Sequence, residues 1–349
     1  MLRSFHRRWK RQAMVCLIAN SMAAMLWSQG QNTSLLTNKE RISKEAAVYE
    51  AKLTNSSTRS SLTQFARIIP MIEKEQGWEL KPGNFPKLAI NLDLDLAPGI
   101  AISKDLLRGL LGFLELRGYT KNDLFLVSYS LKKVKLSQYE EDFLGYEIIT
   151  AKSDHYFNQQ WYHESSLPPA SADHIRLILK YPNQEEVRRL EGRKSYLPHC
   201  LFEEDIWWIN LAKASDDEVL GIRGAVVSST LNAAGNSERF TNDSVIGPAN
   251  AVEILAIPEL WEKHLFSVMD LSRSQFAGGT QFNPKFLKKS DRFWISSNPV
   301  FLDYHAMGYL SEERSKYELI HRDRDKANLF LFAKEIGLGD ASQSRIVKN

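Results

Sequence analysis

The sequence predicts an α/β fold, with an open, mostly parallel sheet and helices on both of its faces, because strand-like and helix-like segments alternate. The strand pattern Lys87–Leu94 is followed by Ser103, a favourable helix N-cap, and by Gly118, a typical helix stop. Leucines recur between them at helical spacing, and a second strand pattern, Leu124–Ser130, comes next. Such a strand–helix–strand unit has parallel strands and a right-handed crossover.

The elements after this unit continue the alternation. Further strands are predicted at Tyr146–Thr150, Ile175–Tyr181, Asp205–Leu211, Leu265–Leu271 and Arg292–Ser297. Helices are predicted after the turn Gly221–Gly224, after the cap Asn298-Pro299, and at Lys326–Ile336, where Gly337 ends the last one.

The first 30 residues resemble a secretory signal peptide. A basic stretch ending at Arg11 precedes the apolar run Ala13–Trp27. This run is shorter than the roughly 20 residues that span a bilayer, so export to the periplasm or the cell exterior is predicted, with no stable transmembrane span after cleavage. Retention as an N-terminal membrane anchor is the alternative. Residues 31–62 are expected to form a linker or surface helix, and residues 63–345 a single α/β domain that begins near Phe65.

Charge and cysteine content narrow the function classes. The 349 residues carry a net charge of +3, but residues 1–30 hold five of the 45 Lys and Arg residues and no acid, which leaves 40 basic against 42 acidic residues in the body. No nucleic-acid partner is therefore expected. Cys16 lies in the leader, so Cys200 alone remains in the body, which excludes an internal disulfide and an iron–sulfur cluster held by four cysteines.

The position of a binding site follows from the predicted sheet, because ligands of open α/β sheets bind beyond the carboxyl ends of the strands. Four segments with polar residues after apolar runs are expected there: Asn91–Ile102, Ser128–Ser130, Asn210–Arg223 and Asp270–Thr280. The sequence therefore predicts a small-molecule ligand in a crevice that these segments form.

The candidate ligand-binding residues begin with Asn91, Asp93 and Asp95, which alternate along a strand and so share one face. Together they would hold a divalent cation or a sugar hydroxyl, or else form a polar strand end in solvent. Lys213 follows an apolar strand and is expected at the crevice mouth, as an anion-binding group or a solvated lysine. Arg223 lies in a glycine-rich turn before a helix, which serves either to bind an anion or only to turn the chain.

The segment Met269–Leu310 supplies the remaining candidates. Asp270 ends a predicted strand, and Gly278 and Gly279 allow a close backbone approach or a positive φ. Asp303 and His305 are two residues apart on one predicted helix, hence about 200° apart around its axis, so they do not form a metal-binding pair. Asp303 is the stronger candidate for the crevice. The metal and other cofactors stay unknown, with a divalent cation possible.

Four blocks of the sequence resemble the domain of unknown function 362 family: LAINLDLDLAPGIAISKDLLRGLLGFLELRG, INLAKASDDEVLGIRGAVVSS, SVMDLSRSQFAGGTQFNP and SSNPVFLDYHAMGYL. Together they cover most of residues 85–339. The residues that match the family motifs are Asn91, Lys213, Asp270, Gly279, Pro299 and Asp303.

The sequence also departs from that family. Ser215 replaces its histidine, Val227 and Ser228 replace a lysine–asparagine pair, and Asn298 replaces an aspartate. The resemblance thus implies an exported member that is divergent or, if the replaced residues bind substrate or metal in the family, inactive.

Two functions remain open. The chain has no HExxH or GxSxG motif. An enzyme acting on a small hydroxylated or anionic metabolite would use Asp270 or Asp303 as acid/base and Lys213 as its electrostatic partner. The alternative is a catalytically silent protein that binds a small ligand or glycan in the same crevice.

Overall fold

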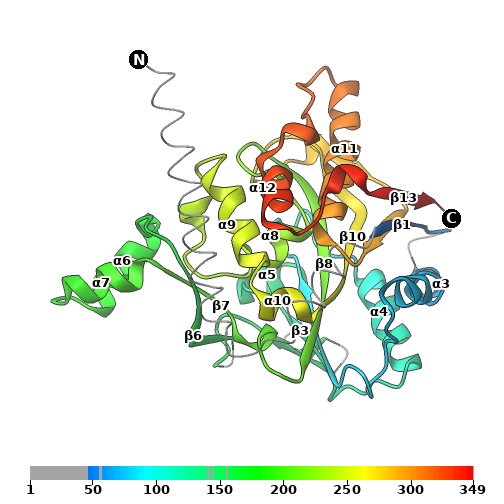
Figure 1. The fold of residues 1–349 in the computed structure, drawn as a ribbon, viewed down its shortest axis with the longest axis horizontal. Coiled ribbons are helices and arrows are strands. Elements are labelled where there is room, and N and C mark those ends of the chain that lie inside the picture. Colours follow the sequence, from blue (N-terminus) through cyan, green and yellow to red (C-terminus); the bar gives the residue numbers. More distant parts are fainter. Residues whose placement is uncertain (1–45, 55–56, 140–141, 144, 155, 349) are drawn as a thin grey trace. The chain divides into compact units, whose positions relative to one another are not determined.

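The computed structural model describes residues 46–348 apart from 55–56, 140–141, 144 and 155 (Figure 1). The described residues belong to one compact unit, residues 45–349. The predicted leader and the start of the predicted linker lie outside the described residues. No helix in the described part is long and apolar enough to cross a membrane.

A mixed sheet of eleven strands forms the centre of this unit, and its five middle strands are parallel. In spatial order these are β5 (Tyr146–Ile149), β3 (Leu124–Val127), β2 (Lys87–Leu92), β8 (Ile206–Asp217) and β10 (His264–Gln275). The prediction of an α/β fold with a largely parallel sheet is confirmed.

Shorter strands extend the sheet on both sides. Beyond β10 lie β12 (Arg292–Ser296), β1 (Ala47–Lys52) and β13 (Arg345–Lys348), and beyond β5 lies β4 (Asp142–Phe143). β12 is antiparallel to both β10 and β1, whereas β13 is parallel to β1. The short strands β9 (Gly221–Arg223) and β11 (Leu287–Lys289) pair with β8 and β10.

Helices cover both faces of the sheet, as predicted, because its inner strands are apolar on both sides. On one face, Leu88 and Ile90 of β2 pack with α3 (Thr58–Gln76), α4 (Lys104–Leu116) and α5 (Leu131–Leu136). Ala89 points to the other core. That core includes residues of α8 (Ala225–Ser229), α9 (Ile246–Leu255), α10 (Pro258–Lys263), α11 (Pro299–Lys316) and α12 (Asn328–Ile336).

Local capping explains where the predicted helices begin. The Ser103 hydroxyl accepts a hydrogen bond from Leu106 N at 3.5 Å at the start of α4, and Gly118 follows that helix with a φ of 96°. Asn298 Oδ1 accepts from Val300 N at 2.9 Å at the start of α11. Short 3-10 helices lie at His199–Leu201, Glu238–Phe240, Pro284–Phe286, Arg324–Lys326 and Ala341–Gln343.

Two predictions about the elements are wrong. The segment expected to be a linker or surface helix up to residue 62 contains β1 and the start of α3, so the unit begins well before Phe65. β1 is held inside the sheet because Val48 and Ala51 are fully buried. The predicted strand Ile175–Tyr181 is instead part of helix α6 (Ser171–Lys180), since its apolar residues fit helical spacing as well as alternation.

Helix α6 belongs to an arm, residues 157–198, that stands apart from the main sheet. It consists of β6 (Phe157–Glu164), α6, α7 (Glu185–Gly192) and β7 (Lys194–Pro198), and β6 and β7 form their own two-stranded sheet. Figure 1 shows α6 and α7 projecting to the left of the other elements of the unit.

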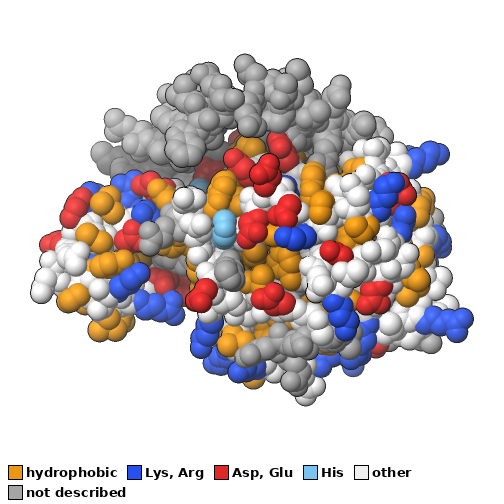
Figure 2. Space-filling model, turned by 90° about the horizontal axis from the view of Figure 1, so that it is seen from below, with side chains coloured by type: hydrophobic (Ala, Val, Ile, Leu, Met, Phe, Trp, Pro, Cys, Tyr) orange, Lys and Arg blue, Asp and Glu red, His pale blue; other side chains and the backbone are white. Residues whose placement is uncertain are grey.

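The described surface carries charges of both signs. On the face shown in Figure 2, acidic and basic side chains are interspersed, and several acidic ones gather near the middle. Among the described residues on this face, no broad basic area stands out.

Candidate functional site

A cavity of about 1050 Å³ opens beyond the carboxyl ends of β2 and β3. All four segments predicted from the sequence contribute to its wall, through Asn91–Asp95, Ser128–Ser130, Arg223 and Thr280. Two further stretches were missed: Leu167–Arg176 of the arm, and residues between Leu231 and Asn242. Both stretches lie outside the main sheet. The site was located from the ends of predicted strands, so these stretches could not be found in that way.

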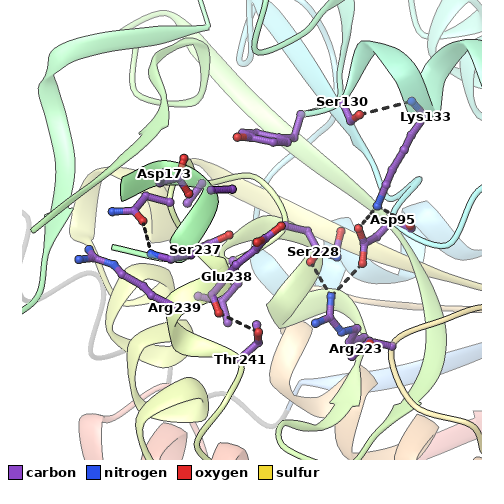
Figure 3. Close-up of a pocket in the computed structure, with 18 of the residues that line it drawn as sticks. Asp95, Ser130, Lys133, Asp173, Arg223, Ser228, Ser237, Glu238, Arg239 and Thr241 are labelled. Atoms are coloured by element: carbon purple, nitrogen blue, oxygen red, sulfur yellow. Dashed lines mark hydrogen bonds and ion pairs between the residues drawn. The ribbon is translucent and has the colours of Figure 1, made fainter. Parts of the chain in front are cut away.

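Asp95 is the centre of a charge cluster in this cavity (Figure 3). Its Oδ2 lies 2.8 Å from Arg223 Nη1, and its Oδ1 pairs with Lys133 Nζ. Figure 3 shows Lys133 and Arg223 reaching Asp95 from opposite sides. Arg223 also binds Asp217 through Nε at 2.7 Å, which fixes the guanidinium in place. The sequence-predicted Arg223 thus lies at the cavity, but it is bound by carboxylates of the same chain.

Asp93 lies beside this cluster and lines the cavity. Its carboxylate accepts hydrogen bonds from Asp95 N at 3.1 Å and from Lys213 N at 3.4 Å. Burial, and then the nearby charge of Asp95, raise the pKa of Asp93 to about 6. A carboxyl group with this pKa exchanges protons near neutral pH.

Asn91 lines the cavity too, as its alternation with Asp93 and Asp95 predicted. Its Nδ2 donates to Asn210 Oδ1 at 2.9 Å and to Ser228 O at 3.2 Å. Asn91 therefore links β2 to β8 and to α8 at the cavity wall. These contacts use both hydrogens of its amide group.

Lys213 and Asp270 form a buried ion pair, with Lys213 Nζ 3.0 Å from Asp270 Oδ2. They are register partners on the neighbouring strands β8 and β10. Both strands continue past the predicted ends, residues 211 and 271, so the two side chains lie within the sheet and not at its edge. The expectation that Lys213 stands at the crevice mouth is wrong, because its side chain is only 4% exposed.

Asp270 is committed to structural contacts. It accepts hydrogen bonds from Ser103 N at 2.8 Å and Ser272 N at 2.9 Å. Burial alone would raise its pKa, but Lys213 and these hydrogen bonds hold the pKa below its usual value. Burial lowers the pKa of Lys213, and Asp270 opposes that shift. Asp270 is not among the residues that line the cavity.

Asp303 is also placed away from the cavity wall. It is fully buried and accepts hydrogen bonds from Ala225 N at 2.5 Å and Val226 N at 2.9 Å, at the start of α8. Burial raises its pKa to about 7, although these two amides act in the opposite direction. A Cβ at Gly224 would lie 2.1 Å from Asp303 Oδ1, so this turn requires glycine. The amides of this turn do bind a carboxyl group, and it is that of the chain's own Asp303.

His305 contacts a different part of the unit from its neighbour Asp303. Its Nε2 lies 2.9 Å from Ser344 Oγ, near the end of the chain. The prediction that Asp303 and His305 do not share a face of the helix is confirmed.

The predicted glycine turn after β10 has the expected backbone, since Gly278 and Gly279 have φ values of 100° and 71°. The Gln275 amide Nε2 donates to Gly279 O and to Gln281 O, both at 3.0 Å, and so holds the turn closed. The glycines shape the loop that brings Thr280 to the cavity wall.

A second space of about 10 Å³ shares Asp93, Asp95, Arg223 and Asn232 with the large cavity. This is about the volume that one water molecule requires. The Asn232 Nδ2 atom is buried and has no hydrogen-bond partner among the described residues. An unsatisfied donor is therefore buried beside the two spaces.

Metal and thiol chemistry gain no support from the described residues. In that part of the chain, no three or more His, Cys, Asp or Glu side chains are grouped so as to hold a metal ion. Cys200 is a buried free thiol whose pKa is raised to about 12 by burial.

Comparisons with known proteins leave the family open. No family model matches the chain, and no curated protein matches it, so the resemblance described above stays a prediction. Among solved structures, the chain resembles a Thermotoga maritima protein whose crystal structure came from a structural genomics consortium, with a TM-score of 0.40 and 12% sequence identity. The match covers 74% of this chain and 59% of that chain.

Proposed function

We propose that this chain is an exported protein that binds a small polar molecule in the cavity beyond β2 and β3. The observation that carries the proposal is the cavity itself, about 1050 Å³ in volume and lined by charged, amide and hydroxyl side chains from six segments. Its volume matches the upper range of small-molecule sites, and its position is that of ligand sites in open α/β sheets. Export rests on the leader-like first 30 residues.

We favour binding over an enzyme that uses Asp270 or Asp303 as its acid or base. Both carboxylates are bound to backbone amides away from the cavity. A carboxylate that transfers protons to a ligand must come within hydrogen-bond reach of it.

A second candidate function is an enzyme in which Asp93 is the acid or base. The observation that favours it is that Asp93 lines the cavity and has a pKa raised to about 6. General acid/base groups work best when their pKa is close to the working pH. Under this alternative, Asp93→Asn would abolish turnover of a ligand while the protein still bound it.

The binding proposal is tested by a thermal-shift screen of the protein against sugars, sugar alcohols, sugar acids and hydroxy acids, with hits measured by calorimetry. Ser237 lines the cavity, so Ser237→Trp should obstruct part of it and weaken binding. The control is Leu116→Trp, at a position 73% exposed on α4. If no compound binds, or if Ser237→Trp binds as well as the unchanged protein, the proposal is wrong.

A further inference from the structure

The charged side chains that line the cavity balance one another. Four carboxylates and four cations contribute to its wall: Asp93, Asp95, Asp173 and Glu238, with Lys133, Arg176, Arg223 and Arg239. A cavity that selects an ion usually presents an excess of the opposite charge. The described lining of this cavity has no excess of either charge.

The two cations nearest the strand ends are already neutralised. Lys133 and Arg223 both pair with Asp95, and Arg223 has a second carboxylate partner in Asp217. Asp95 is 26% exposed and Arg223 12% exposed, so part of this cluster is shielded from water, and its charges interact more strongly than on an open surface. A ligand carboxylate or phosphate would have to displace Asp95 to reach these cations.

The two remaining cations are also engaged. Arg176 Nη1 lies 2.9 Å from Asp173 Oδ1. Arg239 donates through Nη1 to Leu167 O and Gly192 O at 2.9 and 2.8 Å, and its Nη2 contacts the arm as well. Its guanidinium therefore holds the arm and is not directed to a ligand anion.

The cavity nevertheless keeps groups that suit hydroxyls. The Asp93 carboxylate makes no ion pair with a described residue and accepts only two backbone hydrogen bonds, so it retains acceptor capacity. Ser130 and Thr280 line the same cavity with hydroxyl groups, which donate as well as accept hydrogen bonds. A ligand hydroxyl is both donor and acceptor, and so satisfies an acceptor such as Asp93 and donors such as these together.

We infer that Asp95 occupies the anion position of Lys133 and Arg223, and that the cavity thereby selects uncharged, polyhydroxylated ligands such as sugars and sugar alcohols over anionic ones. This inference rests on the proposed function, because it names the ligand class of the same cavity.

The experiment compares the unchanged protein with Asp95→Asn by calorimetry, using inorganic phosphate and the matched pair glucitol and gluconate, which differ in charge at one end. The unchanged protein should not bind phosphate. Asp95→Asn removes the carboxylate partner of Lys133 and frees Arg223 Nη1, while Arg223 Nε stays paired with Asp217. The variant should therefore bind phosphate, and it should bind gluconate at least about tenfold more tightly than the unchanged protein does, the effect of one hydrogen bond to a charged group. Glu186→Gln, which removes the charged partner of Arg189 on α7, outside the cavity lining, is the control and should gain nothing.

The outcomes separate this inference from the proposed function. If Asp95→Asn, shown to be folded by circular dichroism, gains no affinity for phosphate, the inference is wrong. It is also wrong if the screen yields only anionic ligands whose binding Ser237→Trp weakens, and in that case the proposed function stands. If no compound of any class binds, the proposed function fails, and the phosphate titration still decides whether Asp95 occupies an anion position.

Discussion

Asp303 shows how a single carboxylate organises the interior near the cavity. It joins α11 to the first turn of α8 through two backbone amides. Because Gly224 has no side chain, Asp303 Oδ1 fits beside it. The first amides of a helix have no partner within the helix, so a carboxylate placed there satisfies them and also meets the positive end of the helix dipole. The residue matters because α8 carries Ser228 to the cavity wall.

Replacing Asp303 by alanine should therefore destabilise the protein. Asp303→Ala leaves two buried amides without acceptors, and we expect the free energy of unfolding to fall by about 2–4 kcal/mol. Urea denaturation measures this change. His305→Ala removes one side-chain hydrogen bond, to Ser344, and should cost about 1 kcal/mol. Equal losses for the two variants would contradict the structural role given to Asp303.

At the scale of elements, the arm is attached through β6 and β7, where Leu197 is buried in the core, and through side-chain hydrogen bonds near α7. No residue of α6 is buried, so the arm gains little from a core of its own. The hydrogen bonds near α7 come from Arg239, which donates to three carbonyl oxygens and to Ser195 Oγ, and from Asn236, whose Nδ2 donates to Gly192 O and Lys194 O. Because Leu167–Arg176 lines the cavity, these contacts also set one of its walls.

Arg239→Lys should loosen the arm without unfolding the sheet. A single ammonium does not reach the four acceptors that the planar guanidinium spans. We expect faster amide hydrogen exchange in α7 and β7, measured by mass spectrometry, with little change in β2, β8 or β10. Arg176→Lys, at a solvent-exposed ion pair, is the control. Unchanged exchange in the arm, or faster exchange throughout the sheet, would contradict this prediction.

For the whole molecule, buried carboxyl groups link stability to pH. The pKa values of Asp93 and Asp303 are raised to about 6 and about 7, mainly by burial, whereas an unfolded aspartate has a pKa of about 3.9. Between these values the folded protein binds more protons than the unfolded chain. The contribution of these groups to stability is therefore fully present below about pH 4 and is lost as the pH rises towards 7.

Asp93→Asn isolates one part of this effect, since asparagine does not titrate. From pH 4 to pH 7, the unchanged protein should lose stability relative to the variant by on the order of 3 kcal/mol, the equivalent of the shift at Asp93. Denaturation in urea at a series of pH values measures it. A difference between the two proteins that stays constant with pH would show that Asp93 has an ordinary pKa.

The sequence predicts the β2–α4–β3 unit because cap and stop residues mark it locally, and it predicts the edge of the sheet where the cavity lies. It does not predict the role of Lys213 and Asp270. Each looks like a polar strand end until its register partner is known, and that partner lies 57 residues away along the chain. Likewise, nothing in the sequence pairs Asp95 with Arg223, 128 residues later.

The position of β1 has a consequence for how the chain is made. β1 lies between β12 and β13, and Glu50 of β1 contacts Arg292 of β12, 242 residues further along the chain. During synthesis from the N-terminus, β1 leaves the ribosome long before either neighbouring strand exists. β1 thus stays unpaired until translation has passed β12, and the sheet is completed only once β13 has also been made. Until β12 is available, the chain keeps an unpaired, apolar strand that is available to chaperones.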